Sequence, residues 1–135
     1  MPTLSATSDI RGEIIYALKH EVSVTALVPA ARIFPQQVPS SPEWPYIHLG
    51  APIATPVRAD CLDGRAVRVA IHAYALGEPL ADDIADAIAA FLDGSNLSIG
   101  INEADINWIS NTTIRDPYEA GAFHSICQVE IQFSA

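Results

Sequence analysis

The stretch Arg65–Gly94 constrains the fold most, because its apolar pattern changes from a period of two to a helical period across one break. From Val67 to Ala75 every second residue points an apolar side chain to one side, which predicts a strand with one buried face. Gly77 interrupts this pattern, and Pro79 stands where a first helical turn tolerates a missing N–H. The apolar stripe of the predicted helix consists of Leu80, Ile84, Ile88 and Phe91. Gly94 is suited to a left-handed cap at the helix end.

The N-terminal half predicts one helix, one strand and a long loop. Ser8 or Asp9 is placed to cap a helix, and residues 1–8 before it predict a flexible arm. The apolar face of this helix consists of Ile10, Ile14, Leu18 and Val22. Tyr46–Leu49 predicts a strand, and residues 51–64 then predict a long β-hairpin loop that projects before the central strand. Loops of this length are often functional.

The C-terminal half predicts a short strand at Leu97–Ile101 and then an antiparallel hairpin. In the first arm of this hairpin, alternation places five residues on one side: Ile106, Trp108, Ser110, Thr112 and Ile114. The second arm places six residues inward: Phe123, Ser125, Cys127, Val129, Ile131 and Phe133. The turn between the arms covers 116–121.

Together these segments predict a single α+β domain over residues 1–135. We expect a mainly antiparallel sheet of four to five strands with two helices packed on one face. No apolar run reaches the roughly 20 residues of a membrane helix, and the N-terminus lacks the layout of a signal peptide. We therefore expect no membrane contact, and we expect Cys61 and Cys127 to be reduced.

The residues predict no catalytic, cofactor-binding or metal site. The sequence contains no glycine-rich phosphate loop. No histidine has metal-ligand spacing with another histidine or with a cysteine. His72 and His124 could nevertheless meet across neighbouring strands. The acidic residues Asp82, Asp83 and Asp86 are typical of a helix start and a solvated helix face. Two tryptophans, Trp44 and Trp108, are interface anchors or core residues, and we favour the core.

The formal net charge of −9 argues against sequence-independent DNA binding, which needs clusters of Lys and Arg. It does not exclude DNA passing nearby, because a negative wall repels a negative polymer.

The order of segments resembles a known family over almost the whole chain, from Ile10 to Phe133. The resemblance rests on Arg32-Ile33-Phe34, Trp44-Pro45-Tyr46-Ile47-His48-Leu49-Gly50, the strand from Arg65 to Tyr74, the helix from Ala85 to Leu92, and Arg115-Asp116-Pro117. These segments resemble the tail-completion or tail-terminator (head-tail joining) proteins of long-tailed phages, prophages and gene transfer agents.

The resemblance implies a structural virion protein of the tail or neck, assembled in the bacterial host cytoplasm, with no catalytic residues and no cofactor. It implies a homo-hexameric ring that caps the tail tube, ends its polymerisation and joins the head-completion (stopper) proteins, while DNA passes through the lumen without specific binding. Implied partners are further copies of the chain, the major tail tube protein and the head-completion protein. Two other classes stay open, namely another neck component or a small ligand-binding oligomer, with a small enzyme as the least favoured class.

Two segments become candidate interfaces under this resemblance. The first is the 51–64 loop as a docking arm, with polar contacts from Arg58, Asp60, Asp63 and Arg65. The second is the 116–121 turn, with Tyr118 and Glu119.

Overall fold

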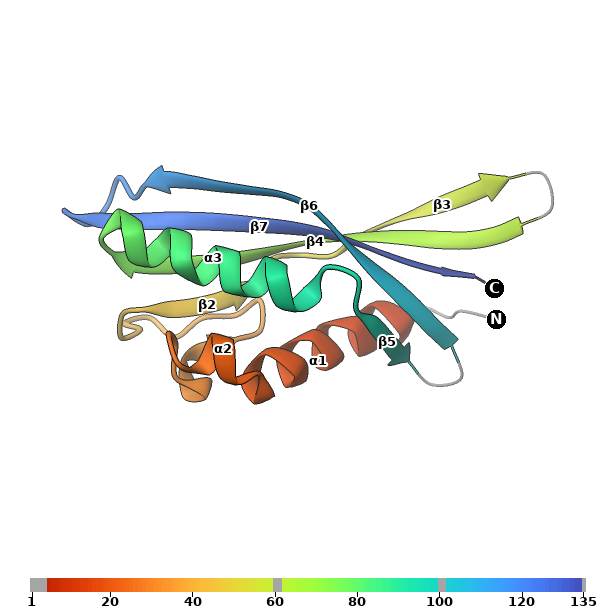
Figure 1. Ribbon diagram of the computed structural model, residues 1–135, viewed down its shortest axis with the longest axis horizontal. Coiled ribbons are helices and arrows are strands. Elements are labelled where there is room, and N and C mark those ends of the chain that lie inside the picture. Colours follow the sequence, from red (N-terminus) through yellow and green to blue (C-terminus); the bar gives the residue numbers. More distant parts are fainter. Residues whose placement is uncertain (1–4, 60–61, 100–101, 135) are drawn as a thin grey trace.

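The computed structural model describes residues 5–59, 62–99 and 102–134 (Figure 1). The helices are α1 (Ser5–His20), α2 (Val22–Thr25), the short 3-10 helix η1 (Ala30–Arg32) and α3 (Glu78–Leu92). The strands are β1 (Ile33–Phe34), β2 (Tyr46–Leu49), β3 (Ile53–Ala59), β4 (Leu62–Leu76), β5 (Asn96–Ile99), β6 (Asn102–Arg115) and β7 (Ala122–Ser134). None of the helices in these described ranges is long and apolar enough to cross a membrane.

The strands form one sheet in the order β1-β2-β4-β7-β6-β5, and β3 pairs with β4 beyond the end of β2. Every pairing is antiparallel except that of β1 with β2. The predicted α+β class with a mainly antiparallel sheet is therefore confirmed. The predicted number of four to five strands is wrong, because the described part of the chain contains seven. The short β1 and the strand β3 account for the difference.

The predicted loop over residues 51–64 is instead an arm of two paired strands. Its register runs from Ile53 opposite Arg68 to Ala59 opposite Leu62. Pairing satisfies backbone N–H and C=O groups that an irregular loop would leave to water. Pro56 is tolerated because β3 is an edge strand. The prediction of a projecting hairpin was right in position, and Figure 1 shows the arm extending beyond the layer of helices.

The core lies between the helices and one face of the sheet (Figure 1). The buried side chains of β4 are those that the alternation predicts, namely Val67, Val69, Ile71, Ala73 and Ala75. On α3 the buried side chains are Ala81, Ile84, Ala85, Ile88 and Leu92, while Leu80 and Phe91 lie partly buried at the margin. Gly94 has the positive φ of 78° expected of a residue after a helix end.

The first helix differs from its prediction at both ends. It begins at Ser5, so residues 5–8 are helical and are not an arm; residues 1–4 lie outside the described ranges. Ile10, Ile14 and Leu18 are fully buried as predicted. Val22 is 75% exposed, because α1 ends at His20 and the chain changes direction before α2.

Strand β6 does not keep one set of residues on one face. A bulge between Trp108 and Ser110 shifts its register against β7 by one residue. A shift of one residue exchanges the two faces of a strand. As a result Ile106 is buried, whereas Ile114 is 47% exposed. The alternation predicted for β7 is confirmed by the full burial of Ser125, Cys127, Val129 and Ile131.

Cys127 is a free, buried thiol whose pKa burial raises to about 12, which makes it unreactive. Cys61 lies outside the described residues.

Candidate interaction surfaces

A cluster of aromatic and histidine side chains lies on the sheet face opposite the helices. Its members are Trp44, Tyr46, His48, His72, Tyr74 and His124, and they come from β7, β4, β2 and the segment just before β2. Their strand neighbours, such as Ile47 and Ile71, point to the core, so alternation directs this set outward. We call this set the outer aromatic cluster.

Cross-strand register brings the rings of the outer aromatic cluster together. Tyr46 stands opposite Tyr74, and their rings stack with centroids 4.7 Å apart. His48 stands opposite His72 with centroids 4.6 Å apart, and Tyr74 stacks on His124 at 4.2 Å. Such cross-strand pairs stabilise a sheet by a few tenths of a kcal/mol to about 1 kcal/mol each. The cluster therefore covers an otherwise exposed sheet face with stacked rings.

Burial keeps the histidines of this cluster neutral. His72 Nδ1 and His124 Nε2 are 2.7 Å apart, so one ring donates a proton and the other accepts it. Burial, with a smaller effect of His48 and His124, lowers the pKa of His72 to about 4. Burial also lowers the pKa of His48 and of His124. At neutral pH the cluster is thus an uncharged surface.

The predicted meeting of His72 and His124 across neighbouring strands is confirmed. Their stacked and paired arrangement does not converge on a common point. Among the residues that the structure describes, no group of three or more His, Cys, Asp or Glu is placed to hold a metal ion.

A row of carboxylates on α3 forms the second surface. Asp82 Oδ1 accepts a hydrogen bond from Thr113 Oγ1 at 2.5 Å, and Asp86 Oδ1 accepts one from Asn111 Nδ2 at 3.2 Å. The backbone N–H of Trp108 donates to Asp93 Oδ1 at 2.9 Å. We call Asp82, Asp86 and Asp93 the acidic row.

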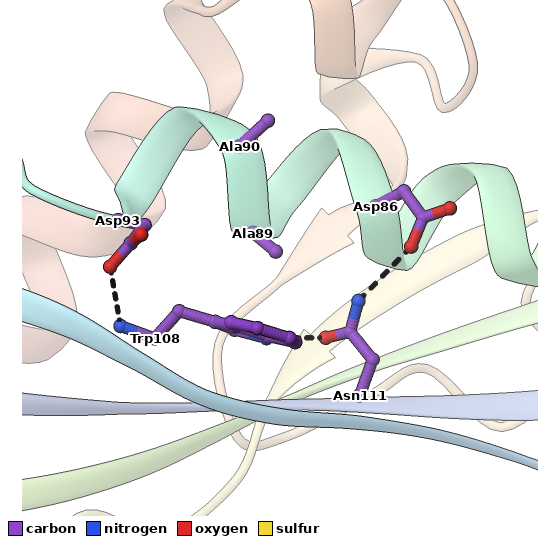
Figure 2. A pocket seen from close by; sticks show the side chains of 6 residues that line it. All are labelled: Asp86, Ala89, Ala90, Asp93, Trp108 and Asn111. Atoms are coloured by element: carbon purple, nitrogen blue, oxygen red, sulfur yellow. Dashed lines mark hydrogen bonds between the residues drawn. The ribbon is translucent and has the colours of Figure 1, made fainter.

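Figure 2 shows the hollow between the acidic row and β6. This hollow has a volume of about 270 Å³ and is lined by Asp86, Ala89, Ala90, Asp93, Trp108 and Asn111. The indole Nε1–H of Trp108 donates to Asn111 Oδ1 at 3.0 Å, which holds the ring across the hollow. Trp108 is 45% exposed, so the favoured interpretation of this residue as core is wrong.

Sequence reasoning assigned Asp82 and Asp86 to a charged helix start and a solvated helix face, and it missed their contacts with β6. A usable signal was present: Asp82, Asp86 and Asp93 are spaced by four and seven residues, which places them on one helix face. The polar side chains of Asn111 and Thr113 alternate on the facing strand.

The outer edge of β6 forms the third surface. Strand β5 pairs with the segment from Asn102 to Asp105. The backbone N–H of Ile106 donates a hydrogen bond to the Ser95 carbonyl, and that of Trp108 donates one to Asp93 Oδ1. From Ile109 to Arg115, β6 has a strand neighbour on one side only in the described part of the chain. We call Ile109–Arg115 the β6 open edge.

The predicted interface residues lie in two separate places. The arm brings Arg58 opposite Asp63 and Arg65 opposite Pro56, while Asp60 lies outside the described residues. Tyr118 is 94% exposed in the turn between β6 and β7, beside Glu119. Figure 1 shows that the arm and this turn lie at opposite ends of the sheet, so the two sets do not form one site.

The turn itself is well defined by local bonds. The backbone N–H of Tyr118 donates to Asp116 Oδ1 at 2.8 Å, and Gly121 closes the turn with a positive φ of 77°. Tyr118 is thereby held outward on an ordered support.

Comparison with known proteins shows a family match and a similarity to solved structures. The family described as Tail completion protein gp17 matches residues 12–134. A chain of the solved structure titled "Virion of native gene transfer agent (GTA) particle" has a similar fold, with a TM-score of 0.82 and 15% sequence identity. The alignment covers 98% of this chain and 100% of that chain. No curated protein sequence matches this chain.

Proposed function

Because this chain belongs to the Tail completion protein gp17 family, we propose that it acts as a non-enzymatic structural protein of a virion tail. The match over residues 12–134 carries this proposal, and it confirms the family that the sequence resembles. The fold shared with a chain of a gene transfer agent virion supports it. In this function residues 1–135 act as one domain.

The finer proposal is a homo-hexameric ring that caps the completed tail tube and stops its growth. Rings form when one surface of a subunit binds a different surface of the next and the rotation closes. The chain offers two such different surfaces, because its arm and the β6 open edge lie on opposite sides of the sheet. One end of the ring contacts the major tail tube protein, and the other contacts the head-completion protein.

DNA passes through the lumen of this ring without specific binding. A hexamer carries a formal charge of −54, six times the −9 of one chain. Acidic residues along the lumen repel the phosphate backbone and keep the DNA from adhering during transit. Basic substitutions of acidic residues that line the lumen should slow or trap DNA, and unchanged DNA delivery would argue against this role.

Two sets of residues are proposed to contact other virion proteins or copies. The first is the arm, with Arg58, Asp60, Asp63 and Arg65. The second is the exposed turn, with Tyr118 and Glu119. Deletion of residues 55–62 tests the arm, since normal assembly of virions without it would exclude a docking role.

The mass of the protein in solution, alone and with its tail tube protein, tests the ring. Light scattering should give about 87 kDa, six times 14.5 kDa, either for the free protein or for the species bound at tube ends. Tubes grown in its presence should be shorter in electron micrographs. A monomer that neither binds tube ends nor limits tube length would refute the proposal.

The alternative of a small ligand-binding oligomer has less support. Ligand sites are concave and mostly apolar. The hollow beside α3 is instead lined in part by the carboxylates of Asp86 and Asp93.

A further inference from the structure

Among the strand edges that lack a partner in the described part of the chain, the two longest differ in character. The first is the outer edge of β3 (Ile53–Ala59), which pairs only with β4 and lies on the projecting arm (Figure 1). The second is the β6 open edge (Ile109–Arg115) on the other side of the sheet. An edge of this kind exposes a row of N–H and C=O groups that another strand can bind.

We propose that β3 of one copy pairs with the β6 open edge of the next copy, so that the sheet continues from subunit to subunit. This inference rests on the proposed ring and names the contact that joins its subunits. The partner is a second copy of this chain, because each copy supplies one edge of each kind. A contact between two different edges is heterologous, and it builds a ring when the rotation between subunits closes.

The two edges match in length. Strand β3 has seven residues, and the β6 open edge from Ile109 to Arg115 also spans seven positions. Pro56 lacks an N–H, so at most one hydrogen bond of the proposed pairing is lost at that position.

The β6 open edge carries neither charge nor proline before its last residue, Arg115, and the bulge between Trp108 and Ser110 lies at its start. From Ile106 to Ile114 the chain contains no charged residue and no proline, whereas natural edges are commonly blocked by Lys, Pro or charge. Its side chains are also partly apolar and exposed: Ile109 is 38% exposed and Ile114 is 47% exposed. On the arm, Ile53 is 64% exposed. A pairing of these edges would bury apolar surface on both copies.

The charges beside the two edges are complementary. The arm from Ile53 to Arg68 contains three of the seven basic residues of the chain, Arg58, Arg65 and Arg68, against two aspartates. Its formal charge is +1 in a chain of net charge −9, and the Arg68 guanidinium is also paired with Glu130 of β7 at 3.2 Å. The acidic row of α3 lies directly beside β6, bonded to Trp108, Asn111 and Thr113. Opposite charges on the two surfaces favour this contact over one between two like edges.

The first test places a positive charge on the β6 open edge. The variant Ile114→Lys repels the arginines of the incoming arm, and we expect its assembly to require at least about tenfold more protein than the unmodified chain. The matched control is Val22→Lys, which changes another exposed apolar residue, 75% exposed after α1 and away from both edges. Circular dichroism and the urea midpoint check that both variants fold.

The second test detects the contact directly by cross-linking. Pro56→Cys on β3 and Thr112→Cys on β6 replace the central residues of the two seven-residue edges, so they stand directly opposite each other in either strand direction. In a Cys61→Ser background, a mixture of the two single variants should form disulfide dimers under mild oxidation. Either variant alone should form several-fold fewer dimers.

The outcomes separate this inference from the proposed function. In one outcome the unmodified protein and Ile114→Lys form rings equally well, and the mixed cysteine variants do not cross-link. The edge pairing is then wrong, and the proposed ring remains. If the unmodified protein forms no ring even with tail tubes, both the ring and the edge pairing are wrong. Loss of rings in Ile114→Lys alone, together with cross-linking of the mixture, supports the pairing.

Discussion

Acidification should destabilise this protein through the outer aromatic cluster, and His72 should contribute most. Burial and the neighbouring histidines lower its pKa from 6.5 to about 4. Below pH 6.5 the unfolded chain therefore binds a proton at His72, whereas the folded chain binds it only near pH 4. Stability that is present above pH 6.5 is thus lost as the pH falls from 6.5 toward 4.

The size of this loss follows from the shift. One pKa unit corresponds to about 1.4 kcal/mol, so the shift of the His72 pKa from 6.5 to about 4 sets an upper limit of about 3–4 kcal/mol. The His72 side chain is only partly buried, and solvent screens part of the effect. We therefore expect His72 to contribute about 1–2 kcal/mol of acid-dependent destabilisation.

The variant His72→Phe isolates this contribution. Phenylalanine keeps a ring that stacks against His48 but cannot bind a proton. Urea unfolding at about pH 7 and about pH 4.5 gives the loss of unfolding free energy on acidification for each protein. This loss should be smaller in His72→Phe by about 1–2 kcal/mol.

A second variant, His20→Phe, is the matched control, since His20 is exposed at the end of α1. It shows what a histidine-to-phenylalanine change does to stability at a site away from the outer aromatic cluster. If His72→Phe loses as much stability on acidification as the unmodified protein, the folded state does not exclude the proton from His72, and the reasoning is refuted.

Three further predictions concern the core and the backbone. Ile88→Ala should lower the unfolding free energy by about 2–5 kcal/mol, because Ile88 is fully buried on the core-facing side of α3. A loss below about 1 kcal/mol in urea unfolding would contradict this packing. Gly12→Ala should stabilise α1 by roughly 0.5–1 kcal/mol, because an added Cβ there has no neighbouring atom within 4 Å. Gly94→Ala should cost about 1 kcal/mol, because the φ of Gly94 is 78°. Thermal unfolding that ranks the stabilities of the two variants in the opposite order would contradict this backbone. Ser125→Ala should be neutral or stabilise by up to about 1 kcal/mol, because the buried Ser125 hydroxyl has no hydrogen-bond partner in the described part of the chain, and a clear loss of stability would show that it has one.

The local pattern of the sequence was sufficient for the elements with one continuous period. The alternation around Ile71 predicted the buried face of β4, and the stripe containing Ile84 and Ile88 predicted the buried face of α3. These predictions succeeded because burial of one face imposes a period on the sequence that reflects the element itself. The family resemblance also came from such segments and their order, and the family match confirms it.

Predictions failed where a pairing partner changes the local structure. The sequence predicted a loop at residues 53–59, because Pro56 and the nearby glycine and aspartates are typical of loops. In the structure these residues pair with β4 as an edge strand. The bulge between Trp108 and Ser110 has no local signature and reverses the faces of the strand after it. Val22 fits the helical period but lies beyond the end of α1.

The sequence by itself determined which segments are strands or helices with a buried face, the negative charge and the family. Only the tertiary structure decided which side chains share a surface. His48 meets His72, and Asp86 meets Asn111, because antiparallel register and helix packing bring together residues separated by 24 and 25 positions. Likewise, the open edges on β3 and β6 exist only as a result of strand order. Local periodicity reports how each element faces the core, whereas the neighbours of an element depend on the packing of the whole chain.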